Sequence, residues 1–440
     1  MRPWGWFSIA FCIVFYLSEK SIAQTTIQRC ATTSYDSLLK AKNPVYRKSR
    51  ERFEELLQQY QKSGKAARIA ENTLTIPVVV HVIHNNQNGT VGGTNNSNIS
   101  DDQIHEQIRV LNEDYRRKEN TNGFNTNPVG ADVNIQFVLA SSDPNGLATD
   151  GIIRTYSSKS GFDPESSEDR HALATISGWP TDRYLNIWVT TLSGNTIGYA
   201  QFPDGTGLAG LDAINGYEDS DGVFIHYGAF GVGPYISSSI YDLGRTTTHE
   251  IGHWLGLLHT WGDTYCGTDY IDDTPVAASA NNSSSLNCVP VYSNCTGTQT
   301  RNMIENYMDY SPDLCMNIFT LGQKDRIWLT LDLSPRRKKL VEYVQTENQL
   351  PESDKLTIRN SYPNPLSSDN RNLRLEVLLK GTQDITVDII NRLGGIVKTS
   401  QYPQIASSNI GIDLTTMAQG IYLVRVRTAN EEKATKVIVY

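Results

Sequence analysis

The 440-residue sequence predicts an α+β domain with a mixed, twisted sheet, followed by a small all-β sandwich. Three observations favour this division. Several strand-like segments and one long helix precede a histidine-containing helix near residue 250. The composition shifts after Leu333, and short alternating segments separated by turn residues begin at Leu356. The length also fits two or three folding units rather than one.

The first residues are typical of a secretory signal. Arg2 supplies a positive charge, and the apolar run Phe7–Leu17 is too short to span a bilayer comfortably. Small residues around Ala23 favour cleavage before Gln24. A membrane anchor is the alternative interpretation. No other segment has the length and apolarity for a transmembrane span, so we expect an exported protein.

The composition describes a soluble globular protein with a net charge of −8 at pH 7. This negative charge argues against nucleic acid or an anionic membrane as the main partner. Tyrosine, asparagine, serine and threonine are frequent, which suits a polar, loop-rich extracellular protein.

Residues 24–70 are charged and helix-prone, especially Arg47–Tyr60, and we expect a processing site around Gly64, Lys65 and Arg68. A helix opens at Ser100, with Ile104, Ile108, Leu111 and Tyr115 at helical spacing. The expected strands are Ile76–His84, Val133–Leu139, Leu185–Val189, Asn195–Phe202 and Gly222–Tyr227. His81, His84 and His226 lie in these strands, and we interpret them as structural residues rather than metal ligands. The basic run Arg336–Lys339 is interpreted as a solvated helix end.

The segment Thr248–His259 carries the strongest chemical signal. His249 and His253 are four residues apart and share one face of a helix, with Glu250 beside them. Gly256 can end the helix in a turn that returns His259 as a third ligand. Three imidazoles and one open position make a catalytic zinc site, and HExxHxxGxxH is the long zinc motif of metzincin peptidases. An amphipathic helix with solvated or core histidines is the alternative.

The chemistry expected from this motif is hydrolysis. A zinc ion held by three neutral histidines lowers the pKa of bound water towards about 7. Glu250 is placed to accept the proton and pass it to a leaving amine. The stretch Asn306–Tyr310 follows the motif, and Met308 within it matches the metzincin Met-turn under the zinc. A core methionine is the bland alternative.

Together these stretches resemble the pappalysin family of metzincins. The likeness covers roughly residues 76–335, including His249–Trp261, Asp272–Pro275 and the turn at Met308. It implies a metzincin catalytic domain built from a mixed, twisted sheet and an active-site helix. It also implies His249, His253 and His259 as zinc ligands, Glu250 as general base and Tyr310 as a donor to the tetrahedral intermediate. An ordinary aromatic residue beside the turn is the alternative for Tyr310.

Six cysteines are present, of which Cys12 lies in the predicted signal and Cys30 stands alone. The other four cluster around the zinc motif, and in an exported protein they indicate two disulfides whose pairing the spacing leaves open. A four-thiolate zinc site is disfavoured because no CxxC pair occurs. The family resemblance implies the pairs Cys266–Cys295 and Cys288–Cys315.

Two further features come from the same resemblance. Bacterial relatives bind calcium near the cleft, and hard oxygen ligands are offered here by Asp269, Asp272, Asp273 and Thr274. A solvated acidic loop is the equal alternative. Some relatives prefer a basic residue after the cleaved bond through an acid that precedes the last cysteine. Here Leu314 precedes Cys315 and Asp313 is one residue further back, which leaves that preference open.

Gln28-Arg29-Cys30 is similar to a short pattern in the propeptides of relatives, where the thiolate caps the zinc. A thiolate is a good fourth zinc ligand and would exclude the catalytic water. We therefore expect Cys30 to keep a proenzyme latent, with an incidental thiol as the alternative.

The C-terminal segment resembles the sorting domain of type IX secretion substrates. Ser361–Pro365, Arg392–Gly395, Met417–Val426 and Lys436–Tyr440 carry this likeness in the expected order. It implies the type IX machinery as a partner. A generic β-sandwich binding module is the alternative.

We therefore predict a secreted or surface-attached zinc endopeptidase that acts on extracellular proteins or peptides and travels through the periplasm. The predicted parts are a signal peptide (1–23), a propeptide (24–70), a catalytic domain (71–345), a linker (346–360) and a sorting domain (361–440). The alternatives are a non-catalytic adhesin with a structural zinc and a zinc hydrolase acting on a non-peptide bond. Glu250 argues against the adhesin, because a structural site needs no general base.

Overall fold

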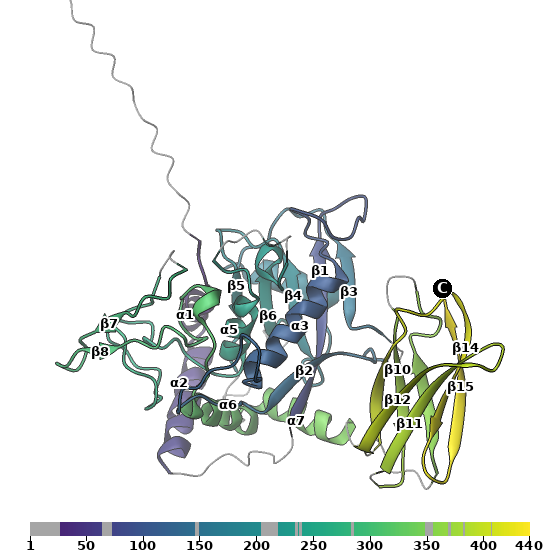
Figure 1. Ribbon diagram of the computed structural model, residues 1–440. Coiled ribbons are helices and arrows are strands. Elements are labelled where there is room, and N and C mark those ends of the chain that lie inside the picture. Colours follow the sequence, from purple (N-terminus) through teal and green to yellow (C-terminus); the bar gives the residue numbers. More distant parts are fainter. Residues whose placement is uncertain are drawn as a thin grey trace, which may run out of the picture.

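The computed structural model describes residues 27–63, 73–145, 149–203, 219–233, 236, 240–282, 286–347, 355–367, 371–381, 383–405 and 407–440 (Figure 1). Three expected features lie wholly or partly outside these ranges: the signal peptide, the processing site at residues 64–68, and residues 348–354 of the linker. Within them, no helix combines the length and apolar character needed to cross a membrane.

A six-stranded mixed sheet forms the centre of the first domain (Figure 1). Its strands run in the order β2-β1-β4-β6-β5, and β3 pairs with β1 beyond the end of β2. All pairs are parallel except β5 with β6, so β5 is an antiparallel edge strand. The bounds are β1 Leu74–His84, β2 Ile135–Leu139, β3 Ile152–Tyr156, β4 Leu185–Thr190, β5 Gly198–Ala200 and β6 Gly222–His226.

Successive side chains of the central strands point to opposite faces of the sheet and pack into two separate cores. On β4, Ile187 and Val189 face the larger core, whereas Trp188 faces the smaller one on the other side of the sheet. The larger core is covered by α2 (Pro44–Lys62), α3 (Asp101–Tyr115), α5 (Arg245–Trp254), α6 (Leu321–Leu333) and α7 (Pro335–Glu347). The smaller core is covered by α1 (Thr32–Lys42) and α4 (Ser167–Ser177). The start of α1 nevertheless reaches α5 at the sheet edge, where the Thr32 hydroxyl donates to Glu250 at 2.8 Å.

The N-terminal helices are integral to this packing. Phe53 and Leu57 of α2 are fully buried in the larger core. Glu54 of α2 forms a two-point ion pair with Arg326 of α6, at 2.9 and 2.6 Å. Arg326 also donates through Nε to the carbonyl of Gly256, in the turn between two histidines of the motif. The expected propeptide is thus connected to the metal-binding loop.

The start of α7 corrects one expectation. We expected Arg336–Lys339 to be a solvated helix end, but Arg336 and Arg337 are buried, 6% and 0% exposed. Arg337 donates to both carboxylate oxygens of Asp221, at 2.6 and 2.9 Å, and its guanidinium lies 3.8 Å from the Trp254 ring centroid. Trp254 closes α5, so this cluster holds α7 against the end of the helix that carries His249 and His253.

Asp221→Asn is expected to lower the free energy of unfolding by about 3–5 kcal/mol, because it leaves the buried guanidinium of Arg337 unpaired. Burial acts to raise the pKa of Asp221, but the charges of Arg337 and Arg336 outweigh it, so the pKa lies below the ordinary 3.8. A lowered folded-state pKa means that the stabilisation is complete above pH 3.8 and is lost as the pH falls through the folded-state pKa. Denaturant unfolding at neutral and acidic pH measures this difference.

The control for this prediction is Asp332→Asn on the neighbouring helix. Asp332 is exposed and pairs with exposed Lys338 at 3.6 Å, so its loss should cost below about 1 kcal/mol. Equal effects of the two substitutions at neutral pH would contradict the role of Asp221.

The second domain is all-β, as expected. A three-stranded sheet, β13-β10-β9, and a four-stranded sheet, β12-β11-β14-β15, enclose their own apolar core (Figure 1). The strands are β9 Thr357–Tyr362, β10 Asn372–Leu378, β11 Gln383–Asn391, β12 Ile396–Ile405, β13 Ser408–Asp413, β14 Gly420–Arg427 and β15 Glu432–Val439. All strand pairs are antiparallel, which is the arrangement of a β-sandwich.

Candidate functional site

Helix α5 places His249 and His253 on one buried face, and the chain then turns to bring His259 to the same point. The turn depends on Gly256, whose φ of +91° is open to glycine but strained for other residues. A Cβ at this position would also lie 2.3 Å from the Thr330 hydroxyl oxygen. The glycine of the motif therefore sets the return path of the third histidine.

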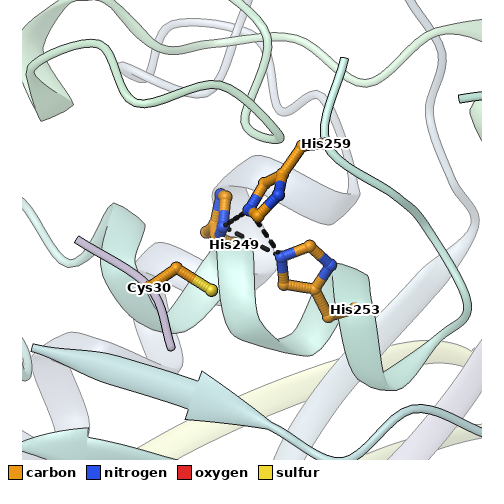
Figure 2. Close-up of side chains that lie close together, drawn as sticks. All are labelled: Cys30, His249, His253 and His259. Carbon is orange, nitrogen blue, oxygen red and sulfur yellow. Dashed lines mark hydrogen bonds between the residues drawn. The ribbon is translucent and has the colours of Figure 1, made fainter. Parts of the chain in front are cut away.

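The three histidines form a compact triangle (Figure 2). Their Nε2 atoms lie 3.1 Å apart for His249 and His253, 3.2 Å for His249 and His259, and 3.0 Å for His253 and His259. All three side chains are fully buried. Cys30 joins them, with its sulfur directed into the group and all four ligand atoms within 4.8 Å of one another.

The opposite ring nitrogens are each held by an acceptor. Nδ1 of His249 lies 2.7 Å from the carbonyl of Tyr307, Nδ1 of His253 lies 2.8 Å from the carbonyl of Leu257, and Nδ1 of His259 bonds Asp263. When each Nδ1 carries the ring proton, each Nε2 has a free lone pair. The triangle is then three acceptors with no donor between them, an arrangement suited to a cation.

Burial favours the neutral form of His249 and His253. It lowers the pKa of His253 to about 3, with the charge of His259 as a second cause. It lowers the pKa of His249 well below its usual range for the same reasons. Burial also raises the pKa of the Cys30 thiol, with the charge of Glu250 adding to the effect. A cation among the ligands opposes that rise, because it favours the thiolate.

Glu250 lies beside the triangle with its carboxyl group fully buried. Its Oε2 accepts a hydrogen bond from Thr32 at 2.8 Å and one from the Cys30 thiol at 3.4 Å. Burial raises the pKa of Glu250 to about 8. Gly198 of β5 permits this position, since a Cβ there would lie 2.9 Å from Oε1. The position of this buried carboxyl beside three histidines that could hold a metal is that of a general base.

The turn after residue 305 lies against the same helix. The sulfur of Met308 would be 2.4 Å from a Cβ at Gly252, so methionine and glycine pack in direct contact under the site. The ring centroid of Tyr310 lies 4.9 Å from that of His259. Its hydroxyl lies 3.5 Å from the carbonyl oxygen of Cys30. The structure thus gathers Cys30, Glu250 and Tyr310 around the three histidines.

Arg29 occupies a buried pocket next to this cluster. Its guanidinium donates to Asp313 at 3.0 Å and to the hydroxyl of Thr246 at 3.1 Å, and it lies 4.1 Å from the Tyr241 ring centroid. The backbone around Arg29 runs along the edge strand, with Gln28 bridged in parallel to Thr196. The N-terminal segment therefore fills both the cluster and the adjacent pocket.

The remaining cysteines form the disulfides Cys266–Cys295 and Cys288–Cys315, the pairs that the resemblance implies. The acidic residues suggested for calcium are not gathered in the same way. Among the described residues, one group of His, Cys, Asp and Glu side chains has metal-binding spacing, and it is the Cys30 cluster. The Asp269 carboxylate instead accepts from the Thr274 hydroxyl, which lies 2.9 and 2.8 Å from its two oxygens, and from the backbone N–H of Ile271 at 3.1 Å. These contacts do not support the expected calcium site.

Sequence reasoning missed two members of the site. Thr32 bonds the general-base candidate, and Asp263 orients His259. Asp263 had a detectable signal, because an acid four residues after the third histidine can return to it. Thr32 had none, because its partner Glu250 is distant in the sequence. Asp313 was noted beside Cys315, and the structure shows that it receives Arg29.

Several known proteins and protein families are similar to parts of this chain. Residues 171–332 match the peptidase M43 family, described as pregnancy-associated plasma protein-A, and residues 360–440 match the secretion system C-terminal sorting domain. An extracellular metalloprotease of Pyricularia oryzae is 33% identical over 259 residues, covering 58% of this chain and 75% of the relative.

Two solved structures are also similar. Tannerella forsythia promirolysin, solved as a point mutant, has a TM-score of 0.58 and 36% identity, covering 72% of this chain and 98% of that chain. Mature mirolysin of the same organism, in complex with a cleaved peptide, has a TM-score of 0.52 and 41% identity, covering 63% of this chain and 98% of that chain.

Proposed function

Because the chain belongs to the pappalysin family and is a secreted metalloprotease, we propose that it is a zinc endopeptidase made as a latent proenzyme. The observation that carries this proposal is the buried cluster of Cys30, His249, His253 and His259. A set of four nitrogen and sulfur ligands suits tetrahedral zinc, whereas calcium and magnesium prefer oxygen ligands.

In the active enzyme, we expect His249, His253 and His259 to hold the ion. When bound, zinc would supply a Lewis acid that polarises the scissile carbonyl and lowers the pKa of water. Tyr307, Leu257 and Asp263 keep the ligand nitrogens of the histidines directed inward, through the bonds to the Nδ1 atoms. This arrangement leaves one position open once Cys30 departs.

Glu250 and Tyr310 supply the remaining chemistry in this proposal. The Glu250 carboxylate takes a proton from the attacking water and delivers it to the leaving amine. The Tyr310 hydroxyl, released from the carbonyl of Cys30, donates a hydrogen bond to the developing oxyanion.

The latent state requires the N-terminal segment to remain in the site. Cys30 would take the fourth ligand position, a role supported by its sulfur lying within 4.8 Å of the three histidine ligand atoms. Thr32 adds a second contact, because its hydroxyl donates to Glu250 and accepts from the backbone N–H of Ala200, both at 2.8 Å. The segment therefore engages the metal ligands, the general base and the edge strand together.

Thr32→Val is expected to shorten the time to activation of the full chain about tenfold. The substitution keeps the shape of the side chain but removes its hydrogen bonds to the buried Glu250 carboxyl and the Ala200 amide, and a net loss of about 1.4 kcal/mol from the two bonds corresponds to tenfold. The measurement is the half-time for appearance of peptidase activity in purified proenzyme.

Thr33→Val is the matched control. The Thr33 hydroxyl lies 3.4 Å from Nδ1 of His259, a nitrogen already bonded to Asp263. Its loss should change the half-time less than about threefold, consistent with the small net worth of a weak hydrogen bond. Equal half-times for the two variants would remove Thr32 from the latency mechanism.

The substrates in this proposal are proteins or peptides that lie along β5. We infer that the pocket holding Arg29 receives a basic substrate side chain after its release. Asp313 provides the negative charge. It lies two residues before Cys315, whereas the acid of some relatives immediately precedes the last cysteine. The sequence alone left this preference open, and the salt bridge of Arg29 with Asp313 now favours it.

The C-terminal domain is a type IX secretion sorting domain, and the protein is secreted or surface-attached. We propose that residues 1–23 are the signal peptide, that residues 24–70 are removed on activation, and that residues 71–345 form the catalytic domain. In this proposal the linker 346–360 leads to the sorting domain 361–440, which contacts the secretion machinery and takes no part in catalysis.

The test is casein hydrolysis by the activated protein before chelation, after chelation and after zinc is returned. We expect one zinc per chain, loss of hydrolysis on chelation and recovery with zinc. A protein that binds zinc, is free of residues 24–70 and cuts no protein would favour the binding-protein or non-peptide hydrolase alternatives.

A further inference from the structure

The pocket that holds Arg29 has an aromatic wall. The guanidinium carbon lies 4.1 Å from the ring centroid of Tyr241, and both residues are buried. At this distance the guanidinium is within range of a cation–π contact, which is strongest where water is excluded.

One short segment builds both the wall and the charged end of this pocket. The carbonyl of Ile240 accepts from the backbone N–H of Asp313 at 2.8 Å. The N–H groups of Leu243 and Arg245 donate to Oδ2 of Asp313, at 3.0 and 3.1 Å. Oδ1 of Asp313 is left for the guanidinium, so residues 240–245 orient the carboxylate and present the ring of Tyr241 beside it.

The other contacts of the guanidinium also follow its planar shape. One terminal nitrogen donates to Asp313 and to the Thr246 hydroxyl, and the other donates to the Met316 sulfur at 3.6 Å. A lysine ammonium is compact and strongly hydrated, and it has no planar face to stack on an aromatic ring. It would keep the attraction to Asp313 but lose the planar stacking that strengthens the contact with Tyr241.

We propose that Tyr241 is the residue that makes this pocket select arginine over lysine in the substrate. The inference rests on the proposed peptidase function and on the use of the Arg29 pocket by substrate. Asp313 attracts either basic side chain, and the ring of Tyr241 discriminates between them. The Tyr241 hydroxyl has a separate role, since it donates to the backbone carbonyl of Tyr310 at 3.2 Å.

The first experiment measures kcat/KM of the activated enzyme for paired peptides that differ by arginine or lysine at the pocket position. Tyr241→Leu should lower the arginine-to-lysine ratio at least tenfold, chiefly by slowing arginine cleavage. Tyr241→Phe keeps the ring and should keep the ratio within twofold. Asp313→Asn should slow both peptides and leave arginine preferred.

A second experiment needs no catalysis. In a full chain carrying Glu250→Ala, Arg29→Lys is introduced with Tyr241 and with Tyr241→Leu, and the four melting temperatures are compared. The lysine substitution should lower the melting temperature clearly when the ring is present and little when it is absent. This thermodynamic cycle isolates the contact between the two side chains.

The outcomes separate the possible failures. An additive cycle would overturn recognition of the guanidinium by Tyr241. A coupled cycle with an unchanged peptide ratio in Tyr241→Leu would overturn its role in substrate selection. Absence of any peptide cleavage by the wild type would instead remove the proposed function, while the cycle would still decide whether Tyr241 recognises arginine.

Discussion

Glu250→Gln is expected to lower kcat/KM of the activated enzyme for a peptide by about 10²–10⁴-fold, the usual contribution of a positioned general base. Glutamine preserves the size of the side chain, and in the latent chain it can still accept the hydrogen bond from Thr32. It cannot accept a proton from water at neutral pH. The measurement pairs initial rates of peptide hydrolysis with zinc content for the variant and the wild type.

The control for this variant is Glu106→Gln, the same chemical change on an exposed position of α3 that pairs with Arg109. We expect unchanged rates for it and unchanged zinc content for both variants. Retention of more than about a tenth of the wild-type rate in Glu250→Gln, well short of the loss expected for a general base, would show that another group takes the proton.

Cys30→Ala is expected to have the largest effect on latency, shortening the half-time for activation by well over tenfold. The thiol is buried within 4.8 Å of the three histidine nitrogens, and a thiolate on the metal is a stronger restraint than a neutral hydrogen bond. The full chain should also unfold at a lower temperature, because one anchor of the N-terminal segment is lost. The time course of activity after purification measures the first effect, and thermal unfolding of the latent form measures the second.

Thr32→Val provides the comparison for this result. It removes a neighbouring contact without touching the metal ligands, so its effect should be smaller than that of Cys30→Ala. A Cys30→Ala proenzyme that stays latent as long as the wild type would show that the segment blocks the cleft without ligating the metal.

Much of the site was visible in the sequence because its key residues lie close together along the chain. His249, Glu250 and His253 share one helical face, and Gly256 marks the turn before His259. Residues this close in the chain have relative positions that the local helix and turn determine, so their arrangement can be read from the sequence. The expected fold class, the family and the sorting domain are confirmed by the comparisons.

The elements that sequence reasoning missed had weak patterns. Strand β3 is half-exposed and shows no alternation of burial. Helix α4 has few buried residues, although Ser166 bonds the backbone N–H of Asp169 and so marks its start. A segment that buries little apolar surface leaves little hydrophobic periodicity to read.

The burial of charged residues could also not be predicted from the sequence. Arg337 and its partner Asp221 are far apart in the chain, so the basic run looked like a solvated helix end. The pairing of Arg29 with Asp313 was equally hard to predict, because these two residues are even farther apart in the sequence. A side chain whose partner is distant in sequence resembles any exposed charge until the fold brings the two together.

The most direct test of the account is zinc X-ray absorption on the full chain before and after activation, with casein hydrolysis assayed on the same samples. In the latent chain we expect one sulfur and three nitrogen ligands on the zinc and no hydrolysis. After activation we expect loss of the sulfur and onset of hydrolysis. A latent chain whose zinc has no sulfur ligand, or an activated chain that keeps the sulfur while cutting casein, would contradict the account.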